Sequence, residues 1–497
     1  MTYLKILHLR GLLGQQRVQE ALVTVALAVV AGLLVLVSSN VSITFVGLYL
    51  MAVAGLVTAA VVGNMRHFMM AMVIADVAVG LDKSLFLRVP HQGGAKGVEL
   101  SLTTMMLVPY WLMWLAQARH SRKSTNVPPR LALSVPTAAM ILVSTLSMIV
   151  AEDLYFSVFA VARLFQFLLL YAFVVHNVQS EDDLRFFLNA MMAVVLAESL
   201  LMILQYVTKA NFDFVGFSSS SVEGFDNDVQ GWRAGGTLGA PNAAAAYLVP
   251  RLLLIFGVLM GHPDPLQKYL GIGAAGAGLV ALIATQSRAG WSTCLTMSIL
   301  LATLALRRSY MRLGMVLLLV LIISLVAVSF SGVVIHRLTA DDHDSAESRV
   351  PMMRVAENMI FANPILGVGV NNYAVVMRDY PGLSPTKDFA YVVHNRFLYI
   401  WAETGTLGLL CLIWFVAIWL GNAYYVYRLD DAHLSPIALG MIAGVLGSLA
   451  AWNVESLPGR QEEQAMWMLA ALAAALHGLV QQKRHRLTSS EMQSTAN

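Results

Sequence analysis

The stretch FLYIWAETGTLGLLCLIWFVAIWL at residues 397–420 decides the class of fold, and Glu403 is its only charged side chain. A helix needs about 20 predominantly apolar residues to cross the hydrocarbon core of a bilayer. This stretch is long enough and apolar enough to do so. We therefore predict a membrane-spanning helix here.

Similar apolar stretches recur along the whole chain, and they predict a polytopic membrane protein of all-α fold. Their number corresponds to about 14 transmembrane helices. They lie at residues 21–38, 43–62, 68–81, 98–117, 132–150, 155–175, 185–207, 240–260, 268–286, 290–306, 312–330, 397–420, 435–452 and 464–481.

The composition agrees with this fold and excludes several classes of protein. Hydrophobic residues make up 58% of the chain and charged residues 12%, against about 45–50% and about 25% in soluble proteins. A net charge of +3 gives no basic face of the kind that binds nucleic acid, so no nucleic-acid partner is expected. Cys294 and Cys411 lie in apolar runs, where we interpret them as buried hydrophobic residues rather than a disulfide or a zinc site.

Basic residues between the predicted spans indicate the orientation, because positively charged connections stay in the cytoplasm. They are Lys5, Arg10 and Arg17 near the start, Arg119, Arg122, Lys123 and Arg130, then Arg307, Arg308 and Arg312, and Lys483, Arg484 and Arg486 in the tail. An even number of spans places both termini in the cytoplasm. Two long segments, 208–239 and 331–396, then face outward, and we expect function on that face.

The second outward loop contains a predicted interfacial helix within SAESRVPMMRVAENMIFANP, residues 345–364. Ser348 is a suitable N-cap, and Asn363 with Pro364 ends the helix. One apolar side and the arginines of its first turns favour a position along the membrane surface. The sequence NPILGVGVNNY follows, and His394 lies just before the next span.

This succession resembles the O-antigen ligase and polymerase superfamily of bacterial envelope glycan enzymes. The similar motifs are a helix opening with Arg349, the NPILGVGVNN turn, His394-Asn395 before an ETGTLG segment, TLGAPNAAAAYLVP at 237–250 and TQSRAGW at 285–291. The resemblance covers roughly residues 230–420. It implies a GT-C-like glycosyltransferase of the bacterial inner membrane with a periplasmic active site.

The resemblance also suggests a division of the chain. Residues 1–207 form an N-terminal transmembrane bundle, and residues 208–420 form the ligase- and polymerase-like core with the loops 208–239 and 331–396. Residues 421–481 supply C-terminal transmembrane helices, and residues 482–497 form a cytoplasmic tail.

The reaction implied by the family transfers a glycan from an undecaprenyl-diphosphate carrier to a sugar hydroxyl. A diphosphate leaving group calls for fixed positive charge, and guanidinium groups bind phosphate oxygens through a bidentate fork. Arg288 and Arg349 are the predicted diphosphate-binding residues, with Arg354 as a weaker candidate. The competing interpretation of Arg288 is an interfacial arginine that reaches the lipid headgroups. The competing interpretation of Arg349 is a solvated residue at the start of a helix.

The acceptor hydroxyl loses a proton as it attacks, and a neutral imidazole is suited to accept it near pH 7. His394 matches the family's histidine and is the predicted catalytic residue, although a histidine before a span is also a common interfacial residue. Asn395 either orients the ring or caps the helix. Glu403 lies deep in the span and should find a partner inside the protein.

Asp342-His343-Asp344 is a competing candidate for a metal site, since paired carboxylates can hold a divalent cation on a diphosphate. A flexible polar loop tip explains this pattern as well. The resemblance implies a metal-independent reaction without a cofactor, in which arginines take the place of the cation.

Other charges fall within predicted spans or near them. Arg163 and Glu198 lie at similar depth, which predicts a structural ion pair, with a role along the substrate path as the alternative. Arg251 follows Pro250 and serves either packing or the lipid carrier. In the first outward loop, Arg233 lies in a glycine- and aspartate-containing stretch that is a candidate for glycan contact.

The predicted function is therefore a glycosyltransferase with an undecaprenyl-diphosphate-linked donor, surrounded by membrane lipid. An acceptor on another carrier makes it a polymerase of O-antigen or exopolysaccharide, and a lipid A core acceptor makes it an O-antigen ligase. Both remain open. A transporter or flippase of lipid-linked oligosaccharide is the alternative from another class, and a scaffold without chemistry is a third.

Overall fold

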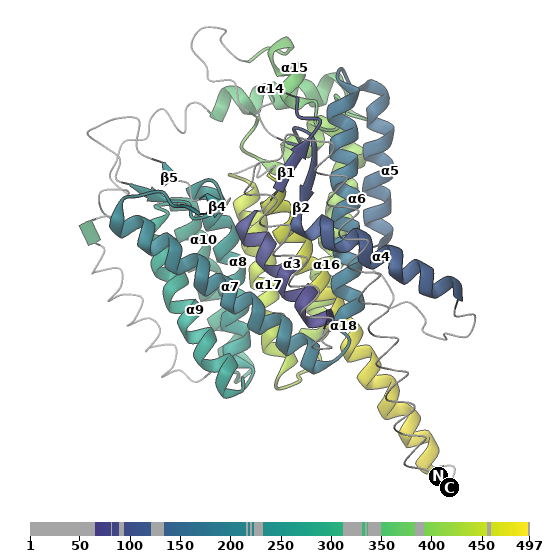
Figure 1. The fold of residues 1–497 in the computed structure, drawn as a ribbon, viewed down its shortest axis with the longest axis vertical. Coiled ribbons are helices and arrows are strands. Elements are labelled where there is room, and N and C mark those ends of the chain that lie inside the picture. Colours follow the sequence, from purple (N-terminus) through teal and green to yellow (C-terminus); the bar gives the residue numbers. More distant parts are fainter. Residues whose placement is uncertain are drawn as a thin grey trace.

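A computed structural model describes residues 65–80, 82–88, 94–120, 134–214, 217–218, 221–222, 232–311, 331–332, 335, 349–382, 392–454 and 459–495. The described part is a helical bundle (Figure 1). Its helices are α3 Met65–Val79, α4 Leu102–His120, α5 Ser134–Ser147, α6 Leu154–Asn177, α7 Glu181–Thr208, α8 Pro241–Met260, α9 Pro265–Ala284, α10 Arg288–Arg307, α14 Arg349–Ala362, α15 Tyr373–Val376, α16 Arg396–Tyr427, α17 Leu434–Trp452 and α18 Arg460–Thr495.

Short strands form three antiparallel pairs beside the helices. They are β1 Asp82–Leu85 with β2 Val98–Ser101, β3 Asp213–Phe214 with β4 Phe217–Ser218, and β5 Ser221–Val222 with β6 Arg233–Ala234. The prediction that the span at 98–117 begins as helix is wrong at its first residues. Val98–Ser101 pair with β1 in register Asp82 to Ser101, and the helix begins only at Leu102.

Eight of the described helices are long and apolar enough to cross a membrane, namely α6 to α10 and α16 to α18. They fit a multi-pass membrane protein, as predicted. The predicted spans at 68–81 and 132–150 correspond to the shorter helices α3 and α5, of 15 and 14 residues. The predicted spans at 21–38, 43–62 and 312–330 lie outside the described residues. The total of about 14 spans stays a prediction.

The helices α16, α17 and α18 run through the middle of the bundle, with α5 and α6 on one side and α7 to α10 on the other (Figure 1). Small residues let α8 and α17 approach closely. A Cβ added at Gly440 would lie 2.6 Å from the Leu253 carbonyl oxygen. Cys294 and Cys411 are free and buried, which confirms their interpretation as small hydrophobic residues.

The motifs NPILGVGVNNY and ETGTLG are joined by backbone hydrogen bonds at a break in α16, and we call this arrangement the lock. Gly405 interrupts α16 with φ 67° and ψ −171°, a conformation that glycine adopts at little cost. The break frees carbonyl groups of α16, which accept hydrogen bonds from the preceding loop. The Val368 N–H donates to the Ala402 oxygen at 2.9 Å and the Gly369 N–H to the Glu403 oxygen at 3.0 Å.

Replacing Gly405 with alanine is expected to destabilise the protein, because a Cβ there would collide with the Ile365 carbonyl and the backbone conformation is strained for alanine. A residue held in such a conformation costs about 1–3 kcal/mol. Thermal unfolding in detergent would measure the loss. Gly421→Ala is the matched control, since a Cβ on Gly421 of the same helix meets only open space. Equal unfolding temperatures of the two variants would contradict the proposed lock.

The predicted loop helix is present as α14, Arg349–Ala362. Its buried side chains pack in a cluster of their own with the segment 392–393 and the start of α16. The cluster contains Met352, Val355, Ala356, Met359, Ile360, Val368, Tyr373, Met377, Val392, Val393, Tyr399 and Ala402. The apolar side of α14 therefore packs mainly on protein, and its position at a membrane surface stays a prediction.

Candidate active site

Arg288 is the first residue of α10 and follows a buried turn from α9. The Ser287 side chain caps α10 by accepting a hydrogen bond from the Gly290 N–H at 3.3 Å. Gln286 adopts a positive φ of 52°, and its side chain donates to the Trp232 carbonyl at 3.2 Å. Thr285, Gln286 and Ser287 are buried, whereas Arg288 is half-buried. The turn thus fixes the backbone from which the Arg288 guanidinium extends.

Arg233 connects this turn to the TLGAPN motif. Its Nε donates to the Thr285 carbonyl at 3.0 Å, and its Nη2 donates to Asn242 Oδ1 at 2.9 Å. The sequence predicts Arg233 only as a candidate glycan contact, whereas these bonds show that it holds the turn before α10. Its place a few residues before the helix start at Pro241 was the available signal.

Replacing Arg233 with glutamine is expected to loosen the turn that carries Arg288. Hydrogen bonds of a charged donor contribute about 1.5–3 kcal/mol. The side chain of glutamine is shorter and carries a single amide nitrogen, so it cannot donate to both Thr285 and Asn242 as the guanidinium group does. If the turn binds a diphosphate, donor affinity should fall about tenfold, which corresponds to about 1.4 kcal/mol. Titration with undecaprenyl diphosphate would measure it. An unchanged affinity would show that these bonds do not position Arg288.

An apolar groove begins at the same turn and runs between α8, α10 and α17. Small and apolar residues line most of it, including Ala246, Val249, Ala289, Gly447 and Val454. The groove places the start of α10 beside the C-terminal end of α17.

Asn395, which follows His394, contacts the same end of α17. Asn395 caps α16, because its Oδ1 accepts a hydrogen bond from the Leu398 N–H at 3.0 Å. Its Nδ2 donates to the Asn453 carbonyl at 3.4 Å. Of the two roles considered for Asn395, the structure shows the helix cap. His394 is half-buried immediately before it.

The first turn of α14 is tied to the residue before His394. The buried Tyr373 hydroxyl donates to the Met352 carbonyl at 3.2 Å and also contacts the Val393 backbone. Burial raises the pKa of Tyr373 well above its usual value, despite an opposing contribution from the Val393 hydrogen bond. The hydroxyl therefore stays protonated and keeps donating to α14.

Arg349 opens α14 and is half-buried, whereas Arg354 is exposed on the same helix. The starts of α10, α14 and α16 and the end of α17 thus lie at one end of the bundle, which we name the α14 end. Arg288 and Arg349 are the first residues of α10 and α14, and His394 lies just before the N-cap of α16. Their roles stay predictions.

Glu403 is buried in α16, and the predicted internal partner is a backbone group. Its Oε1 accepts a hydrogen bond from the Tyr373 N–H at 3.1 Å. The carboxyl group thereby joins the break in α16 to the loop that ends in α15. This contact gives Glu403 a structural role at the α14 end.

The predicted ion pair between Arg163 and Glu198 is wrong. Arg163 Nη2 lies 2.7 Å from Glu99 Oε1, and its Nη1 lies 3.8 Å from Glu463 Oε2. Glu198 instead accepts hydrogen bonds from the Thr237 N–H and hydroxyl, both at 2.8 Å. Similar depth did not make Arg163 and Glu198 neighbours, because Arg163 faces β2 and the start of α18.

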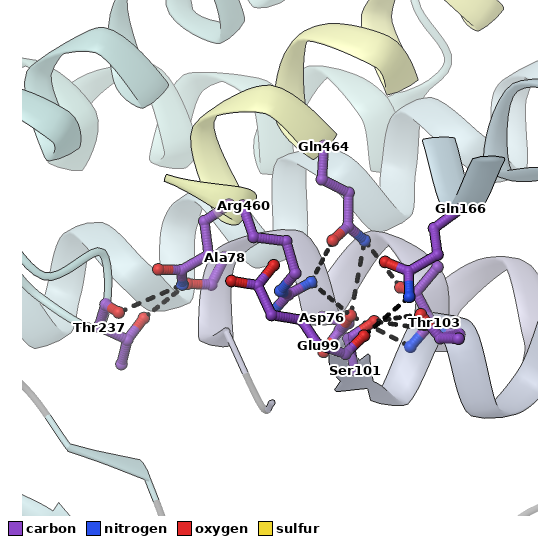
Figure 2. A network of polar contacts seen from close by, with 11 residues as sticks. Asp76, Ala78, Glu99, Ser101, Thr103, Gln166, Thr237, Arg460 and Gln464 are labelled. Carbon is purple, nitrogen blue, oxygen red and sulfur yellow. Dashed lines mark hydrogen bonds and ion pairs between the residues drawn. The ribbon is translucent and has the colours of Figure 1, made fainter. Parts of the chain in front are cut away.

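The helix α18 begins with a polar first turn at Arg460, before the span that the sequence predicts from residue 464. The run RQEEQ at 460–464 connects to several helices (Figure 2). Arg460 pairs with Asp76 of α3 at 3.4 Å, and Gln464 donates to Thr103 of α4 at 2.8 Å. Gln461 donates to the Ala78 carbonyl at 3.0 Å. Five consecutive polar residues next to a predicted span were the available signal.

Glu463 extends this polar turn toward α16. Its Oε1 lies 2.7 Å from Arg396 Nη2, so one carboxylate contacts both Arg396 and Arg163. Arg396 is the second residue after His394 and is buried. The α18 turn therefore fixes the start of α16 from inside the bundle.

Arg251 is fully buried in α8 after Pro250. It donates to the Tyr247 carbonyl at 2.8 Å and to the Ala465 carbonyl at 3.3 Å, and it stacks over the Tyr247 ring. These contacts support a role of Arg251 in packing rather than in binding the lipid carrier.

No group of three or more histidine, cysteine or carboxylate side chains suited to a metal ion is present among the described residues. The Asp342-His343-Asp344 pattern lies outside them.

Residues 273–413 match the family model for O-antigen ligase. This match supports membership of the O-antigen ligase and polymerase superfamily. It confirms the resemblance found in the motifs, and the matched segment contains Arg288, Arg349 and His394. A comparison with curated proteins finds no match.

Proposed function

We propose that this protein is a membrane glycosyltransferase that transfers a glycan from an undecaprenyl-diphosphate carrier to a sugar hydroxyl. The observation that carries the proposal is the O-antigen ligase match over residues 273–413, which contains all three candidate residues. The convergence of their helix ends at the α14 end supports it. A single site there could serve the donor and the acceptor.

In the proposed step, the acceptor hydroxyl oxygen forms a bond to the anomeric carbon of the donor sugar. The bond from that carbon to the diphosphate oxygen breaks, and the diphosphate leaves with the electron pair. His394 accepts the hydroxyl proton as the attack proceeds. Arg288 and Arg349 stabilise the charge that builds on the leaving diphosphate.

The distribution of basic residues supports a periplasmic α14 end. Arg307 and Arg308 lie at the opposite end of α10 from Arg288. Lys483 lies 3.3 Å from Glu181 at the start of α7 and 3.5 Å from Asp431 before α17. Basic connections face the cytoplasm, so the proposed site faces away from it, in the inner membrane.

The test is a transfer assay with the purified protein in proteoliposomes. The donor is an undecaprenyl-diphosphate-linked oligosaccharide, and the acceptor is either a second carrier-linked glycan or lipid A core. A lengthened carrier-linked glycan identifies a polymerase, and a glycosylated lipid A core identifies a ligase. A donor that crosses to the other leaflet without a new glycosidic bond would identify a flippase and overturn the proposal.

A further inference from the structure

A second cavity lies at the α14 end on the opposite side of α16 from the groove between α8 and α10. It is bounded by α5, α6, α16 and the first turn of α18, together with the segments at 94–95 and 370–371. Its volume is about 90 Å³. A water molecule needs about 10–15 Å³ on this scale, so the cavity is large enough for several water molecules or for part of a sugar ring.

Charged groups of both signs face this cavity. Arg163 and Arg396 line it with side chains that are each 7% exposed, and Glu463 lies between them at 3.8 and 2.7 Å. Glu403 lines it as well. Buried ionic groups at membrane depth are costly and are often functional.

The remaining polar lining is made of hydroxyl and amide groups. Ser144, Tyr399, Thr404 and Asn371 contribute these groups. They donate and accept hydrogen bonds, as the carboxylates accept and the guanidinium groups donate. Sugar hydroxyls do both, so this mixed lining suits a neutral glycan. The carboxylates oppose the binding of a second phosphate group.

The second cavity is lined by residues that follow His394, and the groove is lined by the residue before Arg288. Arg396 and Tyr399 of the first turns of α16 line the second cavity, whereas the turn before Arg288 lines the groove. In Figure 1, α5 and α6 lie on one side of α16 and α8 to α10 on the other. A donor at Arg288 and a glycan beside Arg163 and Arg396 would therefore lie on different sides of α16, whose start follows His394.

We infer that the cavity between α5, α6, α16 and α18 is the acceptor site and binds the terminal sugar whose hydroxyl is glycosylated. This inference rests on the proposed function. The edge of a sugar ring would occupy the cavity, with its hydroxyls beside the ion-paired Arg163, Arg396 and Glu463 that line it.

The test uses the full-length protein in nanodiscs and the oligosaccharide released by mild acid from the source bacterium's envelope polysaccharide. Ala160→Leu adds bulk directly into the cavity, and calorimetry should show at least a tenfold weaker binding of the oligosaccharide. Ala138→Leu, the same change at an exposed position of α5, is the matched control and should bind like the original protein. Ser144→Leu fills the cavity from another helix if Ala160→Leu fails to fold.

Binding of undecaprenyl diphosphate and the transfer assay separate the possible results. Retained carrier binding with weakened oligosaccharide binding in the filled variants supports the acceptor site. Oligosaccharide binding that is unaffected by filling, or transfer by a protein that fails to bind the oligosaccharide, overturns it. Weakened oligosaccharide binding in a protein that performs no transfer would keep the sugar site and overturn the proposed function.

Discussion

Replacing His394 with alanine is expected to reduce glycan transfer by at least about 100-fold, the lower range for loss of a general base. The acceptor hydroxyl would then attack without a nearby group to accept its proton. Binding of undecaprenyl diphosphate should persist, because Asn395 still caps α16 through the Leu398 N–H. Initial rates in proteoliposomes with saturating donor would measure the effect.

His176→Ala is the control for the loss of an imidazole. His176 lies in the last turn of α6, beside the rings of Trp111 and Trp114. We expect its replacement to leave transfer within a few-fold of the original rate. Transfer by the His394 variant at the rate of this control would remove the catalytic role of His394.

Replacing Arg288 with alanine is expected to lower the transfer rate by about 10²–10³-fold, as for removal of one group that stabilises transition-state charge. The diphosphate would lose a cation held by the capped start of α10. Lysine at this position should restore only part of the rate, because an ammonium group lacks the planar fork of arginine. Single-turnover rates with bound donor would separate this loss from weaker binding.

Arg307→Lys is the matched control on the same helix. Arg307 is exposed at the opposite end of α10, so its replacement should leave the rate unchanged. If Arg288→Lys also transferred glycan at the full rate, a simple interfacial arginine would explain the position. Loss of donor binding without loss of the single-turnover rate would limit Arg288 to holding the substrate.

The sequence by itself determined the features that depend on neighbours along the chain. The length and apolarity of residues 397–420 predicted the helix α16, since crossing a bilayer depends on a continuous apolar run. The ends of α14 were predicted within a residue or two, because capping and helix-stopping residues act locally. The order of the motifs also predicted a resemblance to O-antigen ligases and polymerases, and the match of residues 273–413 to the O-antigen ligase family model supports it.

Only the tertiary structure decided which distant groups meet. The partners of Arg163 are Glu99 and Glu463, from a strand and from the last helix, and no spacing along the chain reports them. The positive φ of Gly405 breaks α16 and frees two carbonyl groups. These carbonyls accept hydrogen bonds from Val368 and Gly369 in a loop that is distant in the sequence. The physical reason is that ion pairs and cavities arise from helix packing, whereas spans and caps arise from the local sequence.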